Sequence, residues 1–136
     1  MILAIAPEGT RSDDGRLIQG KPGIVILSSR SGVPILPVAY YGHENFKNNF
    51  RRLKRTPMTV RVGKPFRLKI EGQEKSKQAM QAMTDAIMLE IADLLPEQYH
   101  GEYAGMVLDR DKYLEYLDSL SGEQVSQAVG KQFSQA

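Results

Sequence analysis

The spacing of apolar positions changes near the middle of the chain and divides it into a strand-rich part and a helical part. Residues 1–5, MILAI, form a short apolar run typical of a buried, parallel strand. Residues 34–42 indicate another strand, and the alternation over 58–70 predicts one or two half-buried strands. From residue 73 to 95 the spacing becomes helical. One apolar face then contains Met80, Met83, Ile87, Ile91 and Leu94.

Two segments are less clear. Residues 21–34 contain the strand-favouring run IVIL, yet Pro22, Gly32 and Pro34 stand where helices start and stop. Residues 109–120 favour a short helix, and the Ser-, Gln- and Gly-rich residues 121–136 are typical of a flexible tail. Strands interleaved with one early helix and followed by helices predict an α/β domain.

Charge is unevenly distributed between the two parts. Residues 1–72 carry 13 Lys and Arg against 5 Asp and Glu, a net +8, whereas residues 73–136 carry 5 against 11, a net −6. The basic part favours an anionic partner such as a phosphate, a nucleotide or an acidic membrane, although uneven surface charge also serves solubility. The absence of cysteine excludes disulfides and thiolate metal sites. No membrane-spanning run or signal peptide is predicted.

A turn-rich polar loop, residues 8–16 (EGTRSDDGR), follows the first apolar run. In open α/β sheets, ligands bind beyond the carboxyl ends of the strands. Gly9 can take a positive φ and let the backbone approach a ligand, and the planar fork of Arg11 suits two phosphate oxygens. Glu8 would fix that guanidinium or accept a hydrogen bond from a hydroxyl.

Two interpretations of this loop stay open from its residues alone. One is a phosphate site, in which hydroxyls and further cations come from Thr10, Ser12, Arg16 and Lys21. The other is a surface turn whose Glu–Arg pair contributes about 0–1 kcal/mol.

Two motifs together carry a resemblance to a known family. APEGTRS (6–12) and GVPILPVAY (32–40) resemble the third and fourth motifs of the glycerolipid acyltransferases, in the same order and at the same separation. This family comprises glycerol-3-phosphate and 1-acyl-glycerol-3-phosphate acyltransferases. LPEQYHGEYAG (95–105) resembles a C-terminal stretch of bacterial members. The resemblance covers roughly residues 1–105 and implies the C-terminal part of a mixed sheet flanked by helices.

The resemblance implies roles for the matched residues. The acceptor-phosphate site would contain Glu8, Gly9 and Arg11, supported by Thr10 and Ser12, with Arg16 and Lys21 as further contacts. Pro34 and Pro37 match the fourth motif, which shapes the acyl side of the site. Lys21 and Gly23 match a basic-glycine run that opens a helix, which favours helix over 24–31.

The family's reaction needs residues that this chain does not match. Its members transfer an acyl chain from a CoA or acyl-carrier-protein thioester to a glycerol hydroxyl, without a metal or prosthetic group. Their general base is a His oriented by Asp in an Asn-His-xxxx-Asp motif, which lies upstream of the motif that APEGTRS resembles. Here Asn48 stands five residues after His43, and Gly105 five after His100. We therefore expect no catalytic residue in this chain and no acyl transfer by it alone.

The sequence is accordingly interpreted as the C-terminal portion of a 1-acyl-glycerol-3-phosphate acyltransferase that makes phosphatidate in phospholipid biosynthesis. The acyltransferase part would span 1–105, with a short helical extension at 106–120 and the tail at 121–136. Its partners would be a lysophospholipid and an acyl donor, and it would be a cytoplasmic protein, peripheral at the inner face of the membrane. The alternative is a non-catalytic half-domain that binds anionic lipid or a protein.

Residues 45–57 (NFKNNFRRLKRTP) form a strongly basic segment. Phe46, Phe50 and Leu53 recur in it at spacings of 4 and 3. The five cations are Lys47, Arg51, Arg52, Lys54 and Arg55. The segment is either a basic amphipathic element that rests on an anionic membrane, or a solvated one whose apolar residues pack on the domain. No nucleic-acid-binding motif accompanies it, so no nucleic acid is expected as a partner.

Overall fold

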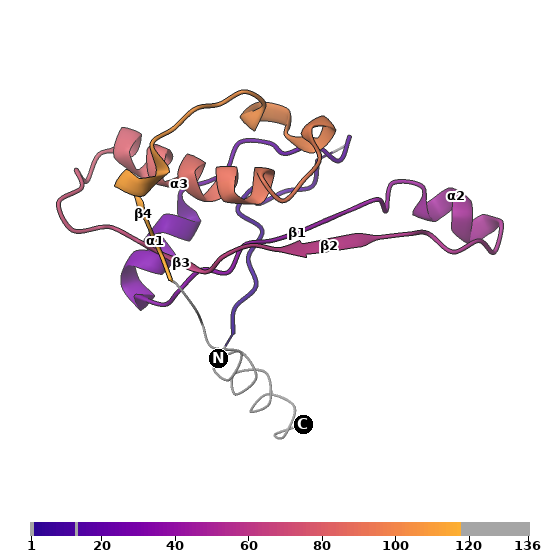
Figure 1. Ribbon diagram of the computed structural model, residues 1–136, viewed down its shortest axis with the longest axis horizontal. Coiled ribbons are helices and arrows are strands. Elements are labelled where there is room, and N and C mark those ends of the chain that lie inside the picture. The colour runs from indigo at the N-terminus through magenta and orange to yellow at the C-terminus, as the bar shows by residue number, and fades with distance from the viewer. Residues whose placement is uncertain (1, 13, 118–136) are drawn as a thin grey trace, which may run out of the picture.

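Helix α3 (Lys77–Ala92) is the element against which the rest of the main body packs in the computed structural model, which describes residues 2–12 and 14–117 (Figure 1). Ser76 caps its first turn, because the hydroxyl accepts a hydrogen bond from the Ala79 N–H at 3.1 Å. The helix ends at Ala92, before Pro96. Met83 and Ile87 are buried as expected, and burial extends to Met88 and Leu89. The helix is therefore covered on more than one face.

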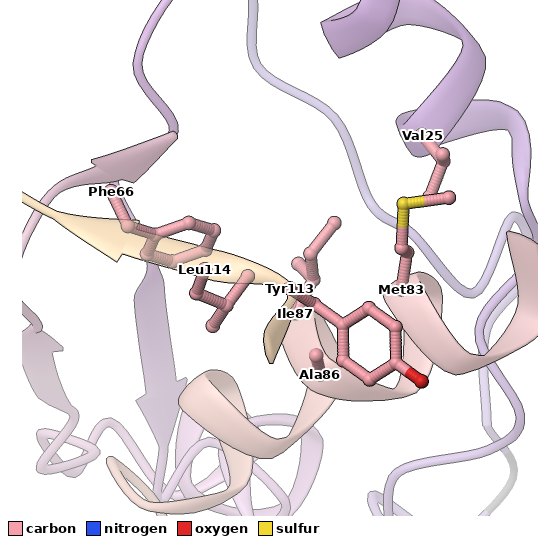
Figure 2. Close-up of a cluster of buried hydrophobic side chains, with 7 residues drawn as sticks. All are labelled: Val25, Phe66, Met83, Ala86, Ile87, Tyr113 and Leu114. Carbon is pink, nitrogen blue, oxygen red and sulfur yellow. The ribbon is translucent and has the colours of Figure 1, made fainter. Parts of the chain in front are cut away.

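One hydrophobic cluster lies between α3, helix α1 (Gly23–Ser31) and a two-stranded antiparallel sheet of β3 (Phe66–Leu68) and β4 (Leu114–Tyr116). Figure 2 shows Phe66 and Leu114 from this sheet, with Val25 and Met83 facing each other from the two helices. Phe66 also forms an antiparallel bridge with Ile35. This cluster joins four elements from different parts of the sequence.

A second cluster lies toward the C-terminal end of α3. Leu17, which directly follows the polar loop, and Tyr103 pack there on the helix. Tyr103 belongs to a pair of single 3-10 turns, η1 (Glu97–Tyr99) and η2 (Gly101–Tyr103). The loop and the 95–105 stretch are thus fixed on the same helix, although about 80 residues separate them.

A long β-hairpin projects from this body (Figure 1). Strands β1 (Val38–Tyr41) and β2 (Thr59–Val62) pair antiparallel, with Val38 opposite Val62 and Tyr40 opposite Val60. Helix α2 (Phe46–Arg51) lies at the far end. No helix among the described residues is long and apolar enough to cross a membrane.

The α/β class is confirmed, and so is the helix over 24–31: it starts after Pro22 and ends at Gly32, whose φ of 62° is left-handed. Strand character in 34–42 and 58–70 is also confirmed. However, every residue of β2 is exposed, so its expected half-burial is wrong. The hairpin leaves the body and has no layer over it.

Two expectations are corrected. Residues 2–6 form no strand and are exposed, because no described strand lies alongside to take their backbone hydrogen bonds. Within residues 106–117, the described part of the expected helical extension (106–120), the helix expected within 109–120 is replaced by a 3-10 turn (Arg110–Lys112) and β4. Pairing with β3 prevails because it buries Leu114 and satisfies the β3 backbone. Residues 118–136, including the predicted tail, lie outside the described residues.

Candidate functional site

Two hydrogen bonds join the start and the end of the polar loop that follows the first apolar run. The Lys21 N–H donates to the Pro7 carbonyl at 2.9 Å. Just inside, the Ile18 N–H donates to Glu8 Oε2 at 2.9 Å. The chain reverses at Gly9, whose φ of +67° favours glycine and whose N–H donates to the Ala6 carbonyl at 3.0 Å. We call residues 7–21 the phosphate loop.

In the described structure the Glu8 carboxylate contacts the loop backbone, and its expected part in phosphate binding stays a prediction. The carboxylate accepts from the backbone N–H of Ile18 and makes no hydrogen bond to Arg11 among the described residues. The Arg11 side chain is exposed, and within the described chain it forms no ion pair. Glu8 therefore holds the shape of the loop, while Arg11 presents its guanidinium to solvent.

The Lys21 side chain lies against the turn. A Cβ placed on Gly9 would lie 3.2 Å from Lys21 Nζ, so the ammonium lies directly beside the Gly9 backbone. Arg16 is instead engaged by Asp14, with 3.6 Å between Arg16 Nε and Asp14 Oδ2 on the surface. Thr10 is exposed and Ser12 half-buried. The Lys21 ammonium therefore lies beside Gly9, and Arg11 follows Gly9 by two residues in the same turn.

A partly buried polar cluster braces the closing end of the phosphate loop. The Gly20 N–H donates to Tyr103 Oη at 2.8 Å, and that hydroxyl donates to Asp85 Oδ1 at 3.2 Å. Gln81 on the same helix donates to both the Gly20 carbonyl, at 3.3 Å, and Asp85, at 2.9 Å. Gly20 itself lies against α3, because a Cβ there would come within 2.7 Å of Met88 Cγ.

A second brace uses the backbone of the 3-10 turns. The Leu17 N–H donates to the Tyr99 carbonyl at 2.9 Å, and the Glu102 N–H donates to the Leu17 carbonyl at 3.1 Å. Gly101 has a φ of +53°, and a Cβ on it would overlap the Leu17 carbonyl oxygen. The stretch 95–105 is thus the support of the phosphate loop.

The residues of these braces were missed from the sequence. Asp85 and Gln81 lie on a helix whose apolar spacing was the dominant signal, and Tyr103 is 83 residues from Gly20. The only local signal for this contact was the Asp85 carboxylate, which stands between buried positions of α3. It indicates a buried polar contact but not its partner.

Tyr103 remains protonated over the physiological range. Its side chain is 2% exposed, and this burial raises the pKa of its hydroxyl to about 12, aided by the Asp85 carboxylate and opposed by the Gly20 N–H. The phenol can therefore donate to Asp85 and accept from Gly20 at the same time.

We expect Tyr103→Phe to lower the free energy of unfolding by about 1–3 kcal/mol, because the buried Gly20 N–H loses its acceptor. Urea unfolding followed by circular dichroism measures this. The control is Tyr116→Phe, which removes a 2.6 Å hydrogen bond to Glu90 at an exposed site and should cost about 1 kcal/mol or less. Equal losses in the two variants would contradict a brace at Tyr103.

The pH dependence of that difference gives a second readout. The folded pKa of Tyr103 is about 12, above the value of about 10 for an unfolded tyrosine. The stabilisation by the Tyr103 hydroxyl is therefore fully present below pH about 10 and is lost as pH rises toward about 12. The stability gap between wild type and Tyr103→Phe should narrow over that range.

The two prolines of the GVPILPVAY stretch lie at the base of the hairpin. The Pro37 carbonyl accepts from the Gly63 N–H at 2.9 Å, and a Cβ on Gly63 would come within 2.8 Å of Pro37 Cγ. Pro37 is buried and Pro34 half-buried. They fix the exit of β1 from the body, and their role on the acyl side stays a prediction.

Neither histidine is paired with a carboxylate by a described hydrogen bond. The His100 ring nitrogen lies 2.9 Å from the Leu95 carbonyl oxygen, which makes it part of the 3-10 turns. The His43 ring contacts the Tyr40 ring, with 5.2 Å between centroids. In the described part of the chain, no group of three or more His, Asp or Glu could hold a metal ion.

Comparison with known proteins agrees with the two motifs. Residues 1–41 match the family model described as Acyltransferase. The 1-acyl-sn-glycerol-3-phosphate acyltransferase of Cocos nucifera is 36% identical over 76 residues, which cover 55% of this chain and 24% of the relative. The enzyme of the same name from Limnanthes alba is 41% identical over 64 residues, covering 46% and 23%. That from Bacillus subtilis is 30% identical over 93 residues, covering 68% and 44%.

The matched region thus spans about a quarter of the plant relatives and under half of the bacterial one. No solved structure matches the chain. The family model covers the phosphate loop, α1 and β1, and the bacterial relative extends the match to most of the chain. This chain belongs to the acyltransferase family that includes the 1-acyl-sn-glycerol-3-phosphate acyltransferases.

Proposed function

We propose that this chain provides the acceptor-phosphate site of a 1-acyl-sn-glycerol-3-phosphate acyltransferase, which acylates lysophosphatidate to phosphatidate. The observation that carries the proposal is the closed phosphate loop. Glu8 and two braces hold its shape, the Lys21 side chain lies against the turn at Gly9, and the exposed Arg11 follows two residues later. The names of the relatives supply the substrate, and the loop supplies a chemistry that fits its phosphate.

Each residue of the loop has a defined task in this proposal. The Arg11 guanidinium donates two parallel hydrogen bonds to phosphate oxygens, and the Lys21 ammonium neutralises the remaining charge. Gly9 lets the phosphate approach the backbone, where a side chain would displace Lys21. Thr10 and Ser12 add hydroxyl donors. Fixing the phosphate also fixes the glycerol hydroxyl, which has to face the thioester.

The acyl transfer itself needs a proton acceptor. The glycerol hydroxyl oxygen attacks the thioester carbonyl carbon, its proton passes to a base, and the thiolate of CoA or of the acyl carrier protein leaves. We assign no residue of this chain to that step, because neither His43 nor His100 has the His-xxxx-Asp spacing. The chain therefore binds the acceptor, and the base comes from outside it.

The binding of sn-glycerol 3-phosphate, measured by isothermal titration calorimetry with the 136-residue chain, tests the site. We expect Arg11→Ala to weaken binding about 10- to 100-fold, since a charge-assisted hydrogen bond contributes about 1.5–3 kcal/mol. Arg30→Ala removes an exposed guanidinium from α1 and should leave binding unchanged. Equal losses in both variants, or binding of glycerol as tight as that of its phosphate, would sink the proposal.

The second test concerns turnover. Purified chain supplied with lysophosphatidate and either acyl-CoA or acyl carrier protein thioester should form no phosphatidate. Phosphatidate formation that is unchanged in Arg11→Ala would mean that Arg11 does not bind the acceptor. Formation that is lost with His43→Ala or His100→Ala would assign the base to this chain and overturn that part of the proposal.

A second function, a non-catalytic module that binds anionic lipid or a protein, has one observation in its favour. The phosphate loop is folded and braced here without a His–carboxylate pair among the described residues. This module would bind anionic headgroups through Arg11 whether or not they carry a free glycerol hydroxyl. Equal affinity for lysophosphatidate and diacyl phosphatidate would favour it.

A further inference from the structure

The far end of the β-hairpin has a surface that the phosphate loop does not explain. We call residues 45–58 the hairpin tip. It contains five exposed cations and no acidic residue. The same short segment exposes Phe46, Phe50 and Leu53, whose exposed fractions are 57%, 69% and 94%. Figure 1 shows α2 at the end of the hairpin, away from the body, so the apolar residues do not pack on the domain.

The two aromatic side chains form one exposed face. Phe46 and Phe50 lie one turn apart on α2, with stacked rings whose centroids are 5.9 Å apart. Within the described residues neither ring is buried against another element. They thus present a joined apolar surface at the end of a projecting hairpin.

Leu53 occupies a position where helices normally place glycine. Its φ is 52°, the only positive φ of a non-glycine residue in the described chain. The Leu53 N–H donates to the Phe50 carbonyl at 3.1 Å, and the Lys54 N–H donates to the Asn49 carbonyl at 2.8 Å. This is the Schellman end of α2, with leucine at its left-handed residue. The leucine strains the backbone and gains no packing, which points to a role outside the fold.

The cations are placed beside this apolar surface. A hollow on the tip is lined by Asn45, Asn48, Asn49, Arg51 and Arg52. Amide and guanidinium donors around a hollow suit the phosphate of a lipid headgroup. Lys47, Lys54 and Arg55 add positive charge around it.

We propose that the hairpin tip docks on an anionic lipid bilayer, with Phe46, Phe50 and Leu53 inserted at the acyl boundary and the five cations on lipid phosphates. Clustered Lys and Arg next to exposed apolar residues are the chemistry that recognises such a surface. A nucleic acid would use the cations but gives no role to a strained aliphatic side chain. This docking is independent of the phosphate loop.

Leu53→Gly gives a test in which the fold is not at risk, because glycine relieves the left-handed strain. We expect it to keep or raise the thermal midpoint and to weaken binding to phosphatidylcholine–phosphatidylglycerol vesicles about tenfold, by flotation. Val107→Gly removes an equally exposed side chain (95%) outside the tip and should bind as wild type does. Unchanged binding of Leu53→Gly would overturn the proposal.

Charge and insertion are tested separately. Lys54→Gln with Arg55→Gln should reduce binding to anionic vesicles at least tenfold, and added salt should weaken wild-type binding in the same way. The chain has no tryptophan, so Phe50→Trp introduces a single indole. Its fluorescence should shift to the blue and be quenched by brominated acyl chains. An unshifted indole, or DNA binding that depends on Lys54 and Arg55 but not on Leu53, would contradict membrane docking.

Discussion

Replacing Gly101 by alanine is expected to lower the free energy of unfolding by about 3 kcal/mol or more. Two costs add at this position. A left-handed φ costs a residue with a Cβ about 1–2 kcal/mol, and overpacking typically costs about 1–3 kcal/mol. The overlap here is with the Leu17 carbonyl oxygen, which belongs to the backbone and cannot rotate away as a side chain can. In Gly101→Ala the phosphate loop must therefore move away from the 3-10 turns at Leu17.

Gly105→Ala separates the two costs. Gly105 has a similar φ of +71°, but a Cβ there would meet no atom within 4 Å. This variant should lose only the conformational part, about 1–2 kcal/mol. Urea unfolding gives both losses, and calorimetry with sn-glycerol 3-phosphate shows whether the site follows the fold. If the two variants lost the same free energy of unfolding, the close contact between Gly101 and Leu17 would make no measurable contribution to stability.

Local signals were sufficient for the helices and the hairpin. The spacing of Met83 and Ile87 predicted α3, and Pro22 with Gly32 predicted α1 against the β propensity of the residues between them. Both depend on contacts within a few residues, which a sequence displays directly. The motif around Arg11 likewise located the candidate site before its geometry was known.

The errors over residues 2–5 and 113–116 concern pairing with segments that are distant in the sequence. Residues 2–5 have the composition of a buried strand, but a strand forms only against a neighbour. Residues 113–116 alternate too briefly to be told from a helix, and only β3, about 50 residues earlier, makes them a strand. The link from Gly20 to Tyr103 has no periodic signal at all. The chemistry of the loop was therefore visible in the sequence, while its support was not.

The largest loss of stability is expected from Phe66→Ala, at about 3–5 kcal/mol. The Phe66 side chain is 0% exposed and belongs to the cluster between α1, α3 and β4, beside Leu114 (Figure 2). Its ring makes an edge-to-face contact with the Tyr116 ring, with 6.3 Å between centroids. Truncation leaves a cavity that both sheet and helices must close. Domains of this size are stable by only about 5–15 kcal/mol, so the variant should be marginally folded.

Phe46→Ala is the matched comparison, because it makes the same chemical change at a ring that is 57% exposed on the hairpin tip. It should change the free energy of unfolding by no more than about 0.5 kcal/mol. If the tip docks on membranes, Phe46→Ala should nevertheless weaken vesicle binding severalfold, whereas any folded Phe66→Ala should bind vesicles as wild type does. A large loss of stability in Phe46→Ala would mean that the ring packs within the protein. The loss of vesicle binding in Phe46→Ala would then follow from the loss of stability, and it would give no evidence that the ring contacts the membrane.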